Sequence, residues 1–283
     1  MNKSLDSREF KLILKPNLFK EFNSGIKNVQ EIIDTEVKKL NGRFKPPDSD
    51  LKLKHRKTYY LDTSDFRLNS KNFFLRIRGD KKSGNYDVTL KCRHPDRYIS
   101  SSYDLSDLKM YDTKFEEDII APHISKFSTS VSFEQDQKPK FDCIEELRST
   151  FPGLITHDLG DGKLLKVNNF EAKEISVKLG KIVYDGKKNN TNDDNKVTLL
   201  VNLWYSPKDE SMPAIVEFTY SYRAINSSPS ISNKRNKENT LIEEFPLSLV
   251  RNTYEFYNSL QKTKVADLRF SKTKTEFAYT YKS

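Results

Sequence analysis

Cationic side chains recur at every second position in two segments that are predicted to be strands. Arg76 and Arg78 share one face of the segment 75–78, because residues two apart in a strand point to the same side. Lys91 lies on the polar face of the segment 86–93, where apolar residues again alternate with polar ones. Paired strands that turn such cations to a common side would bind a multiply charged anion.

Carboxylates join the cations in two further segments with the same spacing of two. Glu9 and Lys11 share a face of the first predicted strand, and Lys114, Glu116 and Asp118 share a face of the segment 114–120. A charged row on a strand is most often only the solvated side of an antiparallel sheet. Here the repeated combination of acids and bases favours a binding site.

The order of these motifs resembles that of the CYTH family, the triphosphate tunnel metalloenzymes, which include thiamine triphosphatases, inorganic triphosphatases and some adenylyl cyclases. The resemblance spans most of the chain, and its order and spacing together are moderately specific. The positions that carry it are Ser7, Glu9 and Lys11; Tyr59 to Thr63; Arg76 and Arg78; Lys91; Lys114, Glu116 and Asp118; Ile215 and Glu217; and Ser271 with Lys272.

The resemblance implies an α+β fold, a closed antiparallel β-barrel with helices packed outside and a polar lumen. It also implies that cations in the lumen contact the phosphate oxygens of a triphosphate or polyphosphate anion. Arginines would do so through planar bidentate forks and lysines as point charges. The phosphate-binding residues implied in this way are Lys11, Arg76, Arg78, Lys91, Lys114 and Lys272.

A divalent metal ion is also implied, with Glu9, Glu116, Asp118 and Glu217 as ligands for Mg²⁺ or Mn²⁺. Glu116 and Glu217 are the expected catalytic residues of a metal-dependent triphosphatase, in which the metal polarises the terminal phosphoryl group. Two family acids are absent, because Ser7 and Ile215 stand where Glu is expected. Asp118 stands where a Glu is usual, which shortens its reach by a methylene.

Two other functions stay open at this level. One is a non-catalytic module that kept the cationic lumen and binds polyphosphate, a nucleotide, or a phosphorylated or RNA partner; the changes at Ser7 and Ile215 favour it. The other is a basic RNA-associated or scaffolding protein that uses the outside of the barrel. Neither the substrate, whether tripolyphosphate, thiamine triphosphate or a nucleoside triphosphate, nor the choice between hydrolase and cyclase follows from the residues.

The composition favours an anionic partner. The chain of 283 residues carries 49 Lys and Arg against 40 Asp and Glu, a net charge of +9. No zinc-finger spacing or aromatic RNA-binding signature supports a nucleic-acid partner. No run of 18 apolar residues indicates a membrane span, and no signal-peptide pattern is present, so a cytoplasmic protein is expected. The oligomeric state stays open.

A single domain over 1–283 is expected, with 185–196 and 226–239 as flexible loops. Helical periodicity predicts helices over 17–40, 124–133, 144–151 and 241–262. Alternation predicts strands over 55–62, 73–78, 86–93, 114–120, 197–205 and 215–224, a strand pair formed by 163–167 and 173–184, and a last strand within 270–281.

Overall fold

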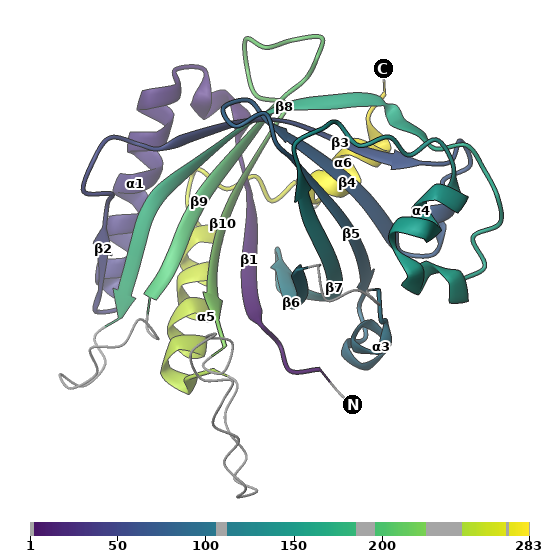
Figure 1. Ribbon diagram of the computed structural model, residues 1–283. Coiled ribbons are helices and arrows are strands. Elements are labelled where there is room, and N and C mark those ends of the chain that lie inside the picture. Colours follow the sequence, from purple (N-terminus) through teal and green to yellow (C-terminus); the bar gives the residue numbers. More distant parts are fainter. Residues whose placement is uncertain (1–2, 106–111, 185–195, 225–244, 270–271, 283) are drawn as a thin grey trace, which may run out of the picture.

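The computed structural model describes residues 3–105, 112–184, 196–224, 245–269 and 272–282. Its strands form one sheet in the order β2-β8-β3-β4-β5-β7-β6-β1-β10-β9, and β8 also pairs with β9 (Figure 1). This last pairing joins the two ends of the row and closes a barrel of nine strands, with β2 attached outside the ring. The fold therefore agrees with the predicted closed barrel.

The strands are β1 (Ser7–Leu14), β2 (Gly42–Lys45), β3 (Leu53–Asp62), β4 (Phe73–Asp80), β5 (Tyr86–His94), β6 (Asp112–Ile120), β7 (Ile124–Gln135), β8 (Leu165–Tyr184), β9 (Lys196–Tyr205) and β10 (Ile215–Arg223). Neighbours in the ring are antiparallel except β1 and β6, which run parallel. The predicted antiparallel barrel is confirmed, with this one parallel pair. A closed ring with an odd number of strands cannot alternate in direction all the way round.

Alternating side chains explain why the barrel has a polar inside and an apolar outside. On β1, Glu9 and Lys11 face the lumen, whereas Phe10 and Leu12 are buried outside. Outside β1, β8, β9 and β10 lie the helices α1 (Phe22–Lys39) and α5 (Leu247–Gln261), whose apolar faces join these outward residues in one core (Figure 1). Burial in this barrel thus comes from its outer wall.

A second core covers the other side of the barrel. Outward residues of β4, β5 and β7, such as Ile77 and Leu90, pack there against α2 (Arg67–Ser70), α4 (Ile144–Thr150) and the 3₁₀ turn η2 (Pro152–Thr156). The remaining short elements are η1 (Pro16–Phe19) and α3 (Arg97–Ser102). The two cores hold the strands from outside and leave the lumen free for charged side chains.

Helix α6 (Lys274–Thr280) begins in a capping box formed by Thr273 and Glu276. The predicted strand within 270–281 is therefore wrong. Alternating polar residues suggested a strand, but the Thr-x-x-Glu signal at the helix start prevails. Ala278 of this helix is buried in a third apolar cluster, with Ile13, Trp204 and Ile215 from the inner wall.

Two other predicted elements were wrong. The segment predicted as a helix over 124–133 is strand β7, which pairs with both β5 and β6 along its length. The predicted pair of strands 163–167 and 173–184 is a single strand, β8, whose register against β3 shifts between Tyr59 and Leu61. In both cases tertiary pairing overrides local propensity. Of the predicted loops, Lys196 already belongs to β9, and the remaining positions lie outside the described residues.

Candidate functional site

The lumen holds a cavity of about 600 Å³ lined by side chains from the inner faces of the barrel strands and from the start of α6. Eleven lining residues are cationic and five are acidic, an excess of six positive charges. The cations are Lys11, Lys52, Lys54, Arg56, Arg76, Arg78, Lys91, Arg93, Lys114, Lys178 and Lys274, and the acids are Glu9, Asp87, Glu116, Glu174 and Glu217.

Five of the six residues expected to bind phosphate line this cavity. Lys11 comes from β1, Arg76 and Arg78 from β4, Lys91 from β5 and Lys114 from β6. Because each pair of positions two apart keeps the same inward face, the spacing of two was sufficient to identify them. The lumen is the only place in the described fold where these five side chains meet.

Lys272 is the exception among the expected phosphate ligands. It does not line the main cavity, and its ammonium donates to the hydroxyl of Thr280 at 3.2 Å on the exposed side of α6. Lys274 takes the inward place instead, with its Nζ 3.1 Å from a carboxylate oxygen of Glu217. Lys272 precedes the helix, which begins at Lys274 after the N-cap Thr273, so the alternation expected of a strand does not apply here. Lys272 lines a small separate cavity that Lys11 and Glu217 also border. Ser271, the other residue of this motif, lies outside the described residues.

Arg78 has no hydrogen bond or ion pair with any of the described residues, although it faces the lumen. Its Nε is buried without an acceptor, and the same holds for the Nε atoms of Arg76 and Arg93. Arg76 donates to the Thr89 hydroxyl at 3.0 Å and lies 3.9 Å from Asp87. Burial lowers the pKa of Arg76, and the adjacent positive charge of Arg78 acts in the same direction.

Asp118 lies at the centre of a cationic cluster. One oxygen is 3.0 Å from Lys11, and the other is 2.8 Å from Arg93 and 3.4 Å from Lys91. Burial acts to raise the pKa of this carboxyl, but the three cations hold it well below its usual range. Burial likewise acts to lower the pKa of Lys11, and the neighbouring carboxylates, Asp118 first, raise it above its ordinary value. Asp118 therefore acts here as a counter-ion.

The other three expected metal ligands are also engaged. Glu9 is 3.0 Å from Lys11, Glu217 is paired with Lys274, and Glu116 accepts from the Ser7 hydroxyl at 3.0 Å. Among the described residues, no group of three or more His, Cys, Asp or Glu is arranged to hold a metal ion. As placed, each of the four acids is held by a cation or a hydroxyl of the lumen.

The two positions where the expected acids are missing have different surroundings. Ser7 faces the lumen side of β1 and hydrogen-bonds to Glu116, so a small polar residue occupies that place. Ile215 is buried in the apolar cluster with Ile13, Trp204 and Ala278. At this position the chain has replaced a charge with packing against α6.

Sequence reasoning missed several lining residues, of which Glu174 on β8 is the most tightly bound. Glu174 is 1% exposed and accepts hydrogen bonds from Thr58, Ser176 and the Trp204 indole, at 2.9, 3.0 and 2.8 Å. Burial acts to raise its pKa, but Arg78 and other nearby cations hold the pKa well below its ordinary value. Ser176 lies two positions after Glu174, so the same spacing of two was the signal. Both residues lie within the predicted strand 173–184, to which the argument from spacing was not extended.

The cations that were missed have similar signals. Arg93 follows Lys91 by two positions, and Lys52, Lys54 and Arg56 form their own row at the start of β3. Lys52, Lys54 and Lys178 are exposed. They lie at the end of the barrel where β3 begins and β8 nears its C-terminal end.

The opposite end of the lumen is closed by α6. Tyr60 contacts the Thr275 hydroxyl at 3.0 Å, Lys126 pairs with Glu276 at 2.8 Å, and Tyr279 donates to Asp62 at 3.0 Å. These contacts hold α6 against β3 and β7 across this end of the lumen. The lumen is therefore a pocket with one closed and one open end. The exposed lysines lie at the open end.

No family model and no curated protein matches this chain. Among solved structures, it is similar to a candidate adenylyl cyclase from Hippeastrum that has a dominant triphosphatase activity, with 13% identity, 77% of this chain and 79% of that chain covered, and a TM-score of 0.31. A candidate adenylate cyclase from Bacillus halodurans gives 13% identity, 84% and 97% coverage, and a TM-score of 0.32. A Pyrococcus horikoshii protein gives 11% identity, 93% and 94% coverage, and a TM-score of 0.35.

Overlaps at these TM-scores carry no functional weight, so the architecture and the side chains of the lumen decide the interpretation. A closed barrel, outer helices and an inward cationic lining are all in place. The chain thus has the closed barrel, outer helices and polar lumen that the resemblance to the CYTH family implied. Five of the six implied phosphate-binding residues line the lumen, whereas Ser7 and Ile215 occupy two positions where acids were expected. No helix among the described residues is long and apolar enough to cross a membrane.

Proposed function

We propose that this CYTH-like barrel binds a triphosphate-containing anion in its lumen. The observation that carries the proposal is Arg78, a lumen-facing guanidinium that makes no hydrogen bond or ion pair with the described residues, although the carboxylates of Glu174 and Asp87 lie near enough to raise its pKa. The phosphate oxygens of a ligand would accept from Arg76 and Arg78 in bidentate fashion and from Lys91 and Lys11 as point charges. The excess of positive charge in the lumen is of the size that a bound triphosphate neutralises.

Hydrolysis of the bound triphosphate is the second part of the proposal. Phosphoryl transfer requires chiefly positioning and stabilisation of charge on the transferred group, and the lumen side chains supply both. Glu116 is the candidate to receive a proton from an attacking water, because it lines the cavity and its side chain is a quarter exposed. Glu217 is paired with Lys274 and is assigned to orienting that cation. Dependence on Mg²⁺ or Mn²⁺ and a cytoplasmic location stay predictions of the resemblance.

Binding is tested by calorimetry with tripolyphosphate. Arg78→Ala should weaken affinity by about 1.5–3 kcal/mol, roughly 10- to 150-fold, the scale of a hydrogen bond to a charged group. Arg78→Lys should also lose affinity, because an ammonium cannot reproduce the fork. Arg251→Ala, on the outer helix α5, is the matched control and should bind like the wild type. Equal affinity of all four proteins would remove the lumen from the proposal.

Catalysis is tested by phosphate release from a panel of triphosphates and diphosphates with Mg²⁺, Mn²⁺ or a chelator. We expect release from triphosphates, and Glu116→Gln should abolish it while retaining most of the metal-free anion affinity. A wild-type protein that binds triphosphate tightly but releases no phosphate under any condition would instead establish the non-catalytic module. The engaged acids and the apolar surroundings of Ile215 are the observations that favour this alternative.

A further inference from the structure

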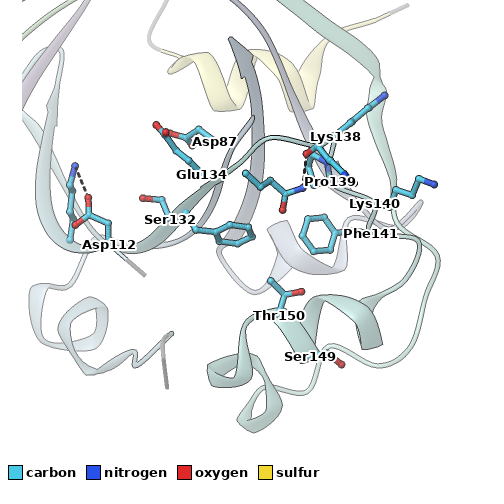
Figure 2. A pocket seen from close by; sticks show the side chains of 14 residues that line it. Asp87, Asp112, Ser132, Glu134, Lys138, Pro139, Lys140, Phe141, Ser149 and Thr150 are labelled. Carbon is cyan, nitrogen blue, oxygen red and sulfur yellow. Dashed lines mark hydrogen bonds and ion pairs between the residues drawn. The ribbon is translucent and has the colours of Figure 1, made fainter. Parts of the chain in front are cut away.

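A second cavity, of about 1110 Å³, adjoins the lumen at its open end (Figure 2). We call it the side groove; it is lined by the ends of β5, β6 and β7, the connection after β7, and α4. Asp87, Lys114 and Ser132 line both the side groove and the lumen. Because the two cavities share these residues, a molecule bound in the lumen can extend into the side groove.

The two cavities differ in charge. The lumen has six more cations than acids, whereas the charged residues of the side groove balance, with Asp87, Asp112 and Glu134 against Lys114, Lys138 and Lys140. An anionic group therefore gains most in the lumen, and an uncharged group is the better match for the groove.

The register of the strands places the acids of the groove along the side that borders the lumen. Asp87 lies opposite Glu134 across β5 and β7, and Asp112 lies opposite Ser132 across β6 and β7. Figure 2 shows Asp87 and Glu134 next to each other, away from the Phe141 ring. These carboxylates accept hydrogen bonds and repel phosphate, so they oppose the entry of a second anionic group.

The groove also offers apolar surface and neutral hydrogen-bonding groups. Phe133 is partly exposed and supplies aromatic surface, with the edge of the buried Phe141 behind it. Hydroxyls come from Ser149 and Thr150 at the end of α4, and amides from glutamines of the connection. In Figure 2 the Phe141 ring lies beside Thr150. A flat polar ring fits such a surface, because its faces pack on aromatic groups while its edge exchanges hydrogen bonds.

We propose that the side groove binds the uncharged organic group of a triphosphate ester whose phosphates occupy the lumen. The preferred substrate class is then a nucleoside triphosphate and not inorganic tripolyphosphate. This inference rests on the proposed function of the lumen and adds the specificity subsite. It also fixes the orientation of the ligand, with the terminal phosphate toward the closed end at α6 and the organic group at the open end.

The comparison of two probes isolates the groove. Inorganic tripolyphosphate carries more negative charge than the triphosphate of a nucleotide, so the cationic lumen alone would bind it more tightly. A preference for the nucleotide thus requires contacts outside the lumen. We expect the wild-type protein to bind ATP or GTP at least tenfold more tightly than tripolyphosphate in metal-free calorimetry.

A substitution in the groove supplies the second measurement. Ser149→Trp places an indole in the groove and should weaken nucleotide affinity at least fivefold while changing tripolyphosphate affinity less than twofold. Ser102→Trp on α3 is the matched control, because both serines are exposed and donate to a backbone carbonyl one turn earlier, at 3.1 and 2.8 Å. This control should change neither affinity.

The outcomes separate this inference from the function of the lumen. Tight, Arg78-dependent binding of tripolyphosphate, with nucleotides no tighter and unaffected by Ser149→Trp, would overturn the side groove and leave the lumen intact. Failure of both ligands to bind would overturn the proposed function itself. Circular dichroism of each variant shows whether a loss of affinity reflects a loss of fold.

Discussion

Arg78 and Asp118 represent two ways in which this barrel accommodates charge away from water. The Asp118 carboxylate is satisfied internally by Lys11, Lys91 and Arg93, at 3.0, 3.4 and 2.8 Å. The Arg78 guanidinium makes no hydrogen bond or ion pair with the described residues. Burial acts to lower its pKa, but the nearby carboxylates of Glu174 and Asp87 raise it above the ordinary value. An anionic ligand would add the charge-assisted hydrogen bonds that Arg78 lacks.

Replacing Asp118 with asparagine tests its role as an internal counter-ion. Asp118→Asn leaves three neighbouring cations without their shared carboxylate, so it should lower the free energy of unfolding by about 3–5 kcal/mol, the scale of breaking a buried ion pair. Tripolyphosphate should restore more stability to this variant than to the wild type, because the ligand supplies the missing charge. Urea unfolding with and without ligand measures both effects. A metal ligand, by contrast, would show its loss only when Mg²⁺ or Mn²⁺ is present.

The pH dependence of binding should report on Lys91. Burial lowers the pKa of its ammonium below the ordinary value of 10.5; Asp118 and Glu116 act to raise this pKa, and Lys11 and Arg93 act to lower it. A bound triphosphate favours the charged form, so it raises this pKa and binding takes up protons where Lys91 is partly neutral. Affinity should therefore fall as pH rises toward 10.5.

Calorimetry at about pH 9, in buffers with different ionisation enthalpies, measures this proton uptake, and the comparison with Lys91→Arg removes the protons that the ligand itself exchanges. In Lys91→Arg the guanidinium stays protonated, so both the uptake and the fall in affinity should be absent. The same proton uptake in the two proteins would exclude Lys91 as its source.

At the scale of elements, α6 decides what the closed end of the lumen can do. It contributes Lys274 to the cavity and Ala278 to the apolar cluster that contains Ile215 and Trp204. The helix thus brings a cation and an apolar surface to one place. The acid expected at position 215 would lie against that surface, which explains why an apolar residue is stable there.

Restoring the expected acid should consequently harm the fold. Ile215→Glu places a carboxyl in an apolar cluster without a hydrogen-bonding partner, which should lower the free energy of unfolding by about 3 kcal/mol or more. The size-matched control Ile215→Leu should cost less than about 1.5 kcal/mol. Urea denaturation of the two variants measures the difference. Recovery or gain of phosphate release in a stable Ile215→Glu protein would show instead that the position still belongs to a catalytic site.

At the scale of the whole molecule, the pairing of β8 with β9 makes the barrel one closed unit. Strands distant in the sequence, such as β1 and β10, are held in the same ring and share the lumen. The two outer cores pack against different sides of this ring. A ligand bound in the lumen therefore contacts most strands at once, and its binding energy should stabilise the whole barrel.

Cooperative unfolding follows from this closure. The single tryptophan, Trp204, lies beside Glu174 in the inner wall, so its fluorescence and the far-UV circular dichroism should give coincident urea transitions. Tripolyphosphate at about 100 times its Kd should raise the free energy of unfolding by about 2.7 kcal/mol in both signals. Two separated transitions would contradict the single domain expected over 1–283.

The sequence by itself determined the inner faces of the strands. Charge at a spacing of two identified Lys11, Arg76 and Lys91 because side-chain direction in a strand depends only on parity, a local property. It also placed the apolar residues of β4 and β5 on the outer wall.

Only the tertiary structure decided how the charges are used. The pairing of Asp118 with three cations, the burial of Ile215 against α6 and the absence of a hydrogen bond or ion pair between Arg78 and the described residues depend on contacts between strands far apart in the chain. Tertiary pairing also made a strand of 124–135, where local periodicity favoured a helix. Parity tells which side a residue faces, but the distances between faces are set when the ring closes.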